Sequence, residues 1–265
     1  MTDKVIVALP AYNEEKYIAG IVEKATRYAD KVFVLDDGST DDTHWEAMGA
    51  GAEVIPHLEN KGYGAAIQSI LSAVRGTGFG VLVIIDADLQ HDPDEIPMLV
   101  KAIRDGADLA IGCRAGKDVP FYRRIGGTIL SVFTWILSGV WVRDSQCGFR
   151  AYSTRAVERI LPMETGMAVG SEVVGIAGRA GLRIVEVPIS VRYLEDSSTH
   201  NPVKQGFYTL WRVVVMIARR RLRRGLRVLL WGLFIGWILF LAVISYMYIP
   251  SQGSETKILR VVRLT

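Results

Sequence analysis

Residues 80–90 read GVLVIIDADLQ, an unbroken apolar run that ends in two aspartates and a glutamine. Two earlier runs have the same form: KVIVAL at 4–9 leads into PAYNE at 10–14, and KVFVL at 31–35 leads into DDGS at 36–39. Continuous apolar runs of this length predict strands buried on both faces, and the amphipathic stretches between them predict helices. The sequence therefore predicts an α/β fold, with a mostly parallel sheet and helices on both of its faces.

The polar residues that follow these runs are expected to share one site, because ligands of open parallel sheets bind outside the carboxyl ends of the strands. Asp86 and Asp88 lie two residues apart, so in an extended backbone both carboxylates point to the same side. Adjacent carboxylates repel each other unless a cation joins them, and the amide oxygen of Gln90 adds a third hard ligand. Asp86, Asp88 and Gln90 are therefore predicted to hold Mg²⁺ or Mn²⁺.

Charge is distributed unevenly along the 265 residues. Residues 1–200 carry 20 basic and 27 acidic side chains, whereas residues 201–265 carry 11 basic side chains and one acidic side chain. The acidic body has no basic stripe, which argues against a nucleic-acid-binding protein. A basic tail suits attachment to an anionic surface. Cys113 and Cys147 lack metal-ligand spacing and are expected to be reduced thiols.

An uncharged run of 22 residues, 228–249, is long enough to cross a bilayer as a helix. Six arginines lie between 219 and 227, and only three basic residues follow the run. The positive-inside rule then keeps the N-terminal body in the cytoplasm. We therefore expect a single-pass cell-membrane protein with a cytoplasmic body at 1–200, an anchor at 226–250 and a short tail at 251–265.

Two further apolar segments are expected to lie on the membrane surface. Residues 125–142 contain no charge, but if they crossed the membrane, the arginines at 219–227 would lie on the wrong side. This segment is therefore predicted to be an interfacial helix. Residues 201–225 are apolar along one side before the arginines begin, which predicts a second, amphipathic surface helix.

Five motifs occur in order along the body: PAYNE (10–14), DDGSTDDT (36–43), N-x-G-x-G-x-A (60–66), DADLQHDP (86–93) and DSQCGFRAY (144–152). Their combination resembles glycosyltransferase family 2, and within it the dolichyl-phosphate (polyprenyl-phosphate) sugar synthases of mannose or N-acetylglucosamine type. The resemblance spans residues 4–200. It implies the type A glycosyltransferase fold, also called the nucleotide-diphospho-sugar transferase fold, and makes 1–200 a catalytic domain.

The resemblance also assigns roles to single residues. The positions matching nucleotide-sugar contacts are Pro10, Tyr12, Glu14, Leu35, Asp37, Asp86, Ala87, Asp88 and, outside the best-matched motifs, Arg192. The metal positions are Asp86, Asp88 and Gln90. The positions matching catalytic or acceptor-phosphate contacts are Asp88, Arg114, Arg124, Asp144 and Arg150. The residues leave open a headgroup-binding role for Arg124 and a structural ion pair for Arg150.

The implied reaction is a metal-dependent, inverting transfer of a hexose or N-acetylhexosamine to dolichyl or polyprenyl phosphate. UDP-N-acetylglucosamine, UDP-glucose and GDP-mannose are the candidate donors. A saccharide or a lipid-diphosphate-sugar acceptor stays open, although the Q-x-x-R-W of processive synthases is absent. A nucleotidyltransferase would need a glycine-rich basic loop where PAYNE stands. Intact carboxylates at all three strand ends argue against a catalytically dead adaptor.

Overall fold

The computed structural model describes residues 3–114, 121–191, 202–221 and 231–238. The strands are β1 (Val5–Ala11), β2 (Lys31–Asp36), β3 (Glu53–Pro56), β4 (Val81–Ile84), β5 (Leu109–Arg114), β6 (Arg150–Ser153) and β7 (Ile184–Ile189). The helices are α1 (Ile18–Ala25), α2 (Thr43–Gly49), α3 (Tyr63–Val74), the 3-10 turn η1 (Pro93–Glu95), α4 (Ile96–Arg104), α5 (Phe121–Ser138), α6 (Thr154–Arg159), α7 (Val169–Arg179) and α8 (Pro202–Arg221). Residues 231–238 are also helical.

The described strands form one sheet in the order β3-β2-β1-β4-β6-β5-β7. Neighbouring strands are parallel except where β6 pairs with β4 and with β5. The predicted α/β fold with a mostly parallel sheet is therefore confirmed. The antiparallel strand β6 matters for the site, because its first residue, Arg150, lies opposite Ile84 at the end of β4.

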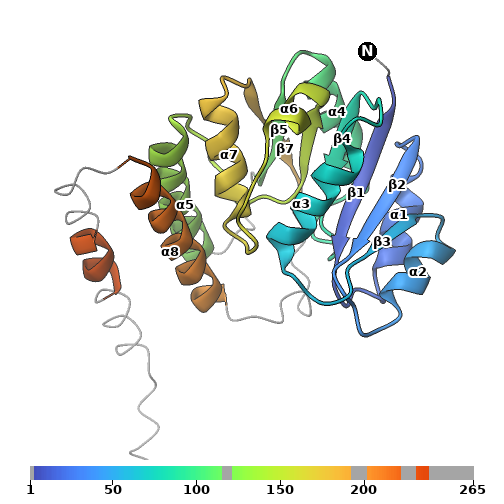
Figure 1. The fold of residues 1–265 in the computed structure, drawn as a ribbon, viewed down its shortest axis with the longest axis horizontal. Helices are drawn as coiled ribbons and strands as arrows, with labels where there is room; N and C mark the ends of the chain where they lie inside the picture. The colour runs from blue at the N-terminus through green and yellow to red at the C-terminus, as the bar shows by residue number, and fades with distance from the viewer. Residues whose placement is uncertain (1–2, 115–120, 192–201, 222–230, 239–265) are drawn as a thin grey trace, which may run out of the picture. The chain divides into compact units, whose positions relative to one another are not determined.

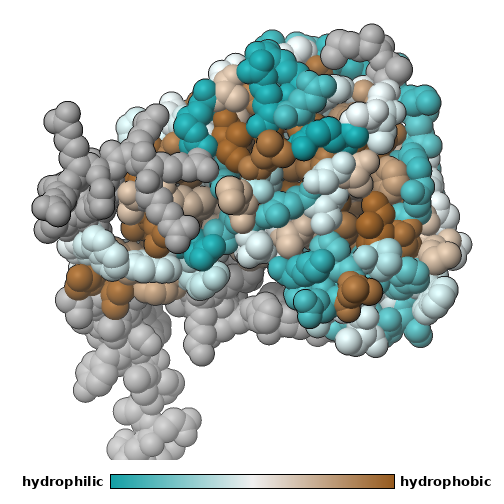
Figure 2. All heavy atoms as spheres, viewed as in Figure 1, coloured by the Kyte–Doolittle hydropathy of each residue, from teal (hydrophilic) through white to brown (hydrophobic). Residues whose placement is uncertain are grey.

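The sheet is covered on both faces. Every residue of β1 and β4 is buried, and side chains alternate between the two faces of a strand, so both faces must be packed. Figure 1 shows α3 crossing in front of the sheet. Among the other helices, α1 contacts η1, and η1 contacts α4. The helices on both faces are thus confirmed. On the face shown in Figure 2, apolar residues form separate patches among hydrophilic ones.

Helix α5 lies partly outside the range predicted for an interfacial helix. It begins at Phe121 and ends at Ser138, whereas the sequence predicted 125–142. The prediction was wrong at the end because Gly139 takes a positive φ of 78°, a backbone conformation that commonly stops a helix. One side of α5 packs against α7, and the other leaves Trp135 and Ile136 exposed.

Most of helix α8, from Pro202 to Ile217, belongs to the same compact unit as the sheet. This unit ends at Ile217, so the boundary predicted near residue 200 lies too early. The reason is burial: Leu210, Val213, Val214 and Ile217 are almost inaccessible to solvent. The second unit begins at Ala218.

The predicted membrane anchor falls mostly outside the described residues. Of 226–250, only residues 231–238 are described, and they are helical. Within the described parts of the chain, the helices are too short or too polar to cross a bilayer. The anchor at 226–250, the tail at 251–265 and the last residues of the surface helix at 201–225 stay predictions.

We expect Leu9→Ala to lower the free energy of unfolding by about 3 kcal/mol, because it opens a cavity beside the central strand. Chemical denaturation of the full-length protein in detergent would measure the change. Leu58→Ala is the matched control, since Leu58 is fully exposed and should change stability by less than about 0.5 kcal/mol. Equal effects of the two substitutions would contradict the assignment of β1 to the core.

Candidate functional site

The topology brings the polar strand ends to one edge of the sheet. β1 and β2 are parallel and in register, with Ala11 opposite Asp36, and β4 runs parallel to β1. The carboxyl ends of all three strands therefore face the same side. Because β6 is antiparallel to β4 and β5, its beginning joins the end of β5, where Arg114 lies. This one edge collects predicted site residues from four of the five motifs, together with Arg114 at the end of β5.

The first two motifs hold each other in place. The Asn13 side chain accepts a hydrogen bond from Thr40 N (2.9 Å), and Asn13 N donates to Ser39 Oγ (3.0 Å). Glu14 N donates to Thr43 Oγ1 at 2.7 Å. Asn13 adopts a left-handed backbone with φ 56°, which asparagine tolerates better than most residues. These contacts explain why PAYNE and DDGSTDDT occur together: each loop supplies the other's hydrogen-bond partners.

Asp37 is buried, and protein groups occupy both of its oxygens. His57 Nδ1 lies 2.6 Å from Oδ1, and the backbone N–H groups of Lys61 and Gly62 donate to Oδ1 and Oδ2 at 3.0 and 2.8 Å. His57 Nε2 in turn lies 2.9 Å from Ser69 Oγ. The predicted nucleoside contact of Asp37 stays a prediction, and in this structure its carboxylate fixes the loop that enters α3.

Asp86 is held between two neighbours. Tyr63 Oη donates to Asp86 Oδ1 at 2.8 Å. On another side the carboxylate packs so closely on Gly148 that any Cβ there would overlap both oxygens. The glycine of DSQCGFRAY is thus required for a close approach to the DADLQ segment.

The carboxylates at this edge are mutually destabilised. Burial raises the pKa of Glu14 to about 7, and the charges of Asp88, Asp41 and Asp86 add to the shift. Burial likewise raises the pKa of Asp88 to about 6, with Asp86 the next contributor. Gln90 N donates to Asp88 Oδ1 (3.1 Å), which only partly offsets the repulsion. The edge therefore carries more negative charge than its neighbours compensate.

This donor set fits a divalent cation bound together with a diphosphate. Among the described residues, no group of three His, Cys, Asp or Glu side chains encloses a metal site. Mg²⁺ and Mn²⁺ commonly take one or two carboxylates and complete their shell with waters and substrate phosphates. Asp88 and Asp86, with the Gln90 amide nearby in the chain, supply that smaller number of oxygens. The unrelieved repulsion gives such a cation a favourable place.

Arg114 and Asp144 form an ion pair beside these acids. Arg114 Nε and Nη2 donate to the two carboxylate oxygens of Asp144 at 2.5 and 2.7 Å, in a bidentate arrangement. Glu186 of β7 orients the pair, because its Oε1 accepts from Arg143 N (2.7 Å) and Asp144 N (3.2 Å). The positive charge of Arg114 also lowers the pKa of Asp88, although burial and Asp86 prevail. The structure thus brings Arg114 and Asp144 to the predicted site.

Arg150 takes the structural alternative rather than facing an open site. It is 4% exposed, and its guanidinium donates to the carbonyl oxygens of Cys147 (2.7 Å), Ser145 (2.7 Å) and Gly170 (3.2 Å). The ion pair left open by the sequence is replaced by these carbonyl contacts. Its acceptor contact stays a prediction, and a phosphate could bind Arg150 only if these bonds were broken or shared.

The other predicted residues differ in accessibility. The side chains of Pro10, Leu35 and Ala87 are buried in or directly after their strands, whereas Tyr12 is 44% exposed. Arg124 lies in the first turns of α5. Arg192 lies outside the described residues.

Several residues of the site carried no sequence prediction. Tyr63 and Gly148 lie inside quoted motifs, but a motif alone does not show which neighbour a side chain meets. Glu186 and His57 lie outside the motifs, and only the tertiary contacts reveal them. His91 is 3% exposed, its Nδ1 has no hydrogen-bond partner among the described residues, and burial lowers its pKa. Its imidazole is therefore neutral near pH 7.

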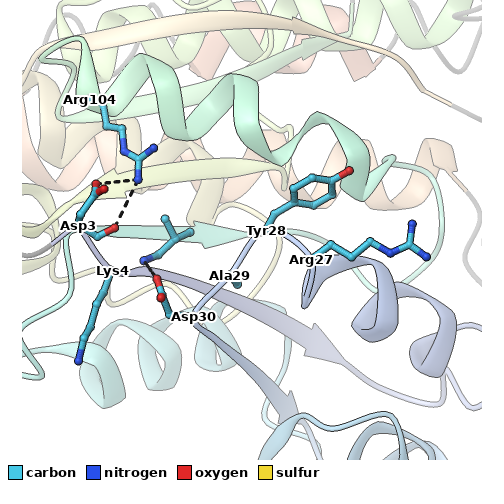
Figure 3. A pocket seen from close by; sticks show the side chains of 8 residues that line it. Asp3, Lys4, Arg27, Tyr28, Ala29, Asp30 and Arg104 are labelled. Carbon is cyan, nitrogen blue, oxygen red and sulfur yellow. Dashed lines mark hydrogen bonds and ion pairs between the residues drawn. The ribbon is translucent and has the colours of Figure 1, made fainter.

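A depression of about 480 Å³ lies elsewhere and is not part of this site (Figure 3). It surrounds the beginning of β1, whereas the carboxylates follow the ends of the strands. Its charged groups are largely paired: Arg104 contacts Asp3 at 2.7 Å, and Val5 N donates to Asp30 at 2.7 Å. The strand-end carboxylates, not this depression, mark the candidate site.

The family model for glycosyl transferase family 2 matches residues 6–161, which include all five motifs. The chain belongs to this family. A dolichyl-phosphate N-acetylglucosaminyltransferase of Methanococcus voltae that uses UDP-N-acetylglucosamine is 32% identical over 82% of this chain and 97% of its own length. A polyprenol monophosphomannose synthase of Mycolicibacterium smegmatis is 30% identical over 71% of this chain and 77% of its own.

A solved structure supports the fold and the donor class. The glucosyl-3-phosphoglycerate synthase of Mycobacterium tuberculosis, in complex with Mn²⁺, UDP and glucosyl-3-phosphoglycerate, superposes with a TM-score of 0.64 and 26% identity. The match covers 82% of this chain and 80% of that one. The predicted type A glycosyltransferase fold is confirmed. This family 2 member is therefore an enzyme that transfers a sugar from a nucleotide-sugar.

We predict that Mn²⁺ affinity in the presence of UDP falls as the pH drops from about 8 to about 6. The raised pKa values of Glu14 (about 7) and Asp88 (about 6) mean that protons compete with the cation across this range. The sign of the stability effect is opposite: without metal, folding favours the protonated acids, so stability falls as the pH rises from the ordinary carboxyl pKa values of about 4 to the raised values of about 6 and 7. Calorimetric titration and thermal unfolding at several pH values measure both slopes.

The control for this prediction is Glu14→Gln, which removes one titrating group and should flatten the stability slope of the metal-free protein. Asp105→Asn should leave both slopes unchanged, because Asp105 is exposed and remote from the strand ends. A Mn²⁺ affinity that does not change between about pH 6 and 8 would contradict the assignment of Asp88 to the cation.

We predict that Arg150→Met lowers the free energy of unfolding by about 3 kcal/mol, because three buried carbonyl oxygens lose their donor. Arg155→Met is the matched control: Arg155 is half exposed, its contact with Asp108 is 3.5 Å, and its loss should cost less than about 1 kcal/mol. Urea denaturation measures both. Unchanged stability with lost transfer would instead assign Arg150 to the acceptor.

Proposed function

We propose that the protein transfers a hexose or N-acetylhexosamine from a nucleotide-sugar to dolichyl or polyprenyl phosphate, with inversion at the sugar carbon and with Mg²⁺ or Mn²⁺. The observation that carries the proposal is a single sheet edge where the acids Glu14, Asp86 and Asp88 adjoin Arg114. The acids suit a cation with the donor diphosphate, and the arginine suits a second anion, the acceptor phosphate.

UDP-N-acetylglucosamine is the donor we favour. The Methanococcus voltae relative that uses it aligns over nearly its whole length, and the Mycobacterium tuberculosis structure contains UDP. The mannose-transferring relative aligns over a smaller share of both chains, which makes GDP-mannose the second donor to test. UDP-glucose is the third.

The proposed displacement needs no general base. An oxygen of the acceptor phosphate, whose second pKa is about 6, is already ionised near pH 7. That oxygen forms a bond to the anomeric carbon while the bond from this carbon to the donor diphosphate breaks, and the nucleoside diphosphate leaves.

The residues would then act by electrostatics. Asp88, Asp86 and Gln90 would hold the cation, which supplies charge neutralisation for the leaving diphosphate. Arg114 would orient the acceptor phosphate through its planar guanidinium. Asp144 holds that guanidinium through two hydrogen bonds, and Glu186 keeps Asp144 in place. The predicted roles of Arg124 and Arg192 belong to the same proposal.

A membrane location would place this site next to its lipid acceptor. Ile125, Trp135 and Ile136 of α5 and the nearby Trp141 are 37–51% exposed, and such side chains suit the headgroup region. Together with the arginines at 219–227, they support a cytoplasmic catalytic domain on a single-pass anchor in the cell membrane.

The test is transfer by the full-length protein in membranes, with dolichyl phosphate, Mn²⁺ and each labelled donor in a separate reaction. We expect a labelled lipid product from UDP-N-acetylglucosamine. Asp88→Ala should reduce transfer by about 10² to 10³, because the cation loses a ligand where charge develops. Asp105→Ala is the control, as it removes an exposed carboxylate far from the site.

Binding of a nucleotide-sugar without any lipid product would instead favour a saccharide or lipid-diphosphate-sugar acceptor. Full activity of Asp88→Ala at saturating Mn²⁺ would contradict the metal assignment.

A further inference from the structure

Tyr63 is the first residue of α3, and its side chain reaches the candidate site. Its hydroxyl donates to Asp86 Oδ1 at 2.8 Å. Burial raises the pKa of Tyr63 well above its usual value, and Asp86 raises it further. The phenol is therefore protonated near pH 7 and acts only as a donor toward Asp86.

Two glycines fix the backbone on either side of Tyr63. Gly62 N donates to Asp37 Oδ2 (2.8 Å), and Gly64 N donates to Thr165 O (2.8 Å). At Gly64 a Cβ would overlap the carbonyl oxygen of Glu164, so this turn of α3 lies directly against the 164–165 backbone. Tyr63 is consequently placed by contacts from two opposite directions.

The 164–165 backbone is itself held by buried charges. Glu164 is 5% exposed, and Arg212 of α8 contacts both of its oxygens, with Nε at 2.9 and 3.1 Å and Nη2 at 2.8 Å. Glu172 of α7 accepts from Met163 N and Glu164 N at 2.8 and 2.7 Å. A buried carboxylate that loses an arginine partner is strongly destabilised, so Arg212 is needed to keep this loop where it is.

These contacts form one continuous path. It leads from Arg212 on α8 to Glu164, through the Thr165 carbonyl to Gly64, and from Tyr63 to Asp86. We propose that Tyr63 is a positioning residue that fixes the Asp86 carboxylate for the nucleotide and its cation, and that Arg212 holds Tyr63 in place. The inference rests on the proposed use of Asp86 in that site.

The hydroxyl of Tyr63 is separable from the fold. The beginning of α3 is anchored by the backbone bonds of Gly62 and Gly64, which do not involve the hydroxyl. A phenylalanine would fill the same space and lose only the donor to Asp86. On its other side Asp86 meets the Cα of Gly148, which cannot replace that donor. The carboxylate would then be free to rotate.

The first experiment titrates UDP, and separately GDP, with Mn²⁺ into the full-length protein in detergent. We expect Tyr63→Phe to weaken the affinity for the bound nucleotide about tenfold, as for other lost hydrogen bonds to a charged group. In transfer assays, KM for the nucleotide-sugar should rise while KM for the lipid phosphate stays unchanged.

Tyr28→Phe is the matched control. Tyr28 Oη also donates to an aspartate, Asp94 Oδ1, at 2.8 Å, but it lies at the beginning of the strands, beside the depression in Figure 3. It should leave nucleotide affinity unchanged. Equal affinity of Tyr63→Phe and the wild type would overturn the proposal. So would a larger fall in thermal stability for Tyr63→Phe than for Tyr28→Phe, since the hydroxyl would then serve the fold.

The second experiment tests the path from α8 with a double-mutant cycle. Arg212→Met should weaken nucleotide binding severalfold in the wild type and should have little further effect in Tyr63→Phe. Arg104→Met, which removes a surface pair with Asp3, is the control. Additive losses from Arg212→Met and Tyr63→Phe would overturn the role of Arg212.

These outcomes are separate from those of the proposed function. A protein that binds nucleotide with Mn²⁺ but transfers sugar to no polyprenyl phosphate contradicts only the proposed acceptor, and the role of Tyr63 is still measured by binding. A wild type that binds neither UDP nor GDP with Mn²⁺ overturns both.

Discussion

Repulsion between carboxylates at one edge of the sheet is the constraint around which the site is organised. Parallel strands deliver their carboxyl ends to the same edge, and here three of them end in acids. Glu14 and Asp88 respond with raised pKa values, because burial and neighbouring charge both disfavour ionisation. Under the proposed function, a cation and a diphosphate bound at this edge would relieve the repulsion.

The surrounding hydrogen bonds hold the repelling carboxylates and their loops in position. The Asn13 and Thr40 loops hold each other, Asp37 fixes the entry to α3, and Tyr63 fixes Asp86. Each of these bonds prevents a carboxylate or its loop from turning away toward water. The site is therefore preorganised: the cost of holding like charges together is met during folding, before any substrate arrives.

The sequence was sufficient for the framework because apolar runs and their polar ends are local patterns. The strands at 4–9, 31–35 and 80–85, the parallel sheet and the shared edge follow from such patterns. The antiparallel strand β6 did not, since Arg150–Ser153 is short and its direction is set by partners distant in the chain. The end of α5 at Ser138 does not follow from the sequence pattern either, because the uncharged run continues past Gly139 to residue 142.

The residues of the site likewise fall into two groups: those that the sequence reveals and those that only the tertiary contacts reveal. Asp86 and Asp88 could be assigned from their motif and Arg114 from the family resemblance, because each lies at or just after the end of a strand. Residues that act through contacts between distant segments could not, and Tyr63 and Arg212 are examples. Arg150 shows the limit most clearly: the chemistry of an arginine in a motif suggests an anion partner, whereas three carbonyl oxygens in fact surround it.

The contact between α5 and α7 has a further consequence. Thr134 Oγ1 lies 2.7 Å from Ser171 Oγ and 3.2 Å from Ser145 Oγ, and Gln146 Nε2 donates to Ser171 Oγ at 2.7 Å. Hydroxyl and amide hydrogen bonds hold this seam together, so it does not depend wholly on water driving apolar surfaces together. Such bonds persist in a surrounding of hydrocarbon, where the hydrophobic effect between helices vanishes. These bonds would therefore hold α5 in place even if its exposed side lay against lipid, as the proposed membrane location requires.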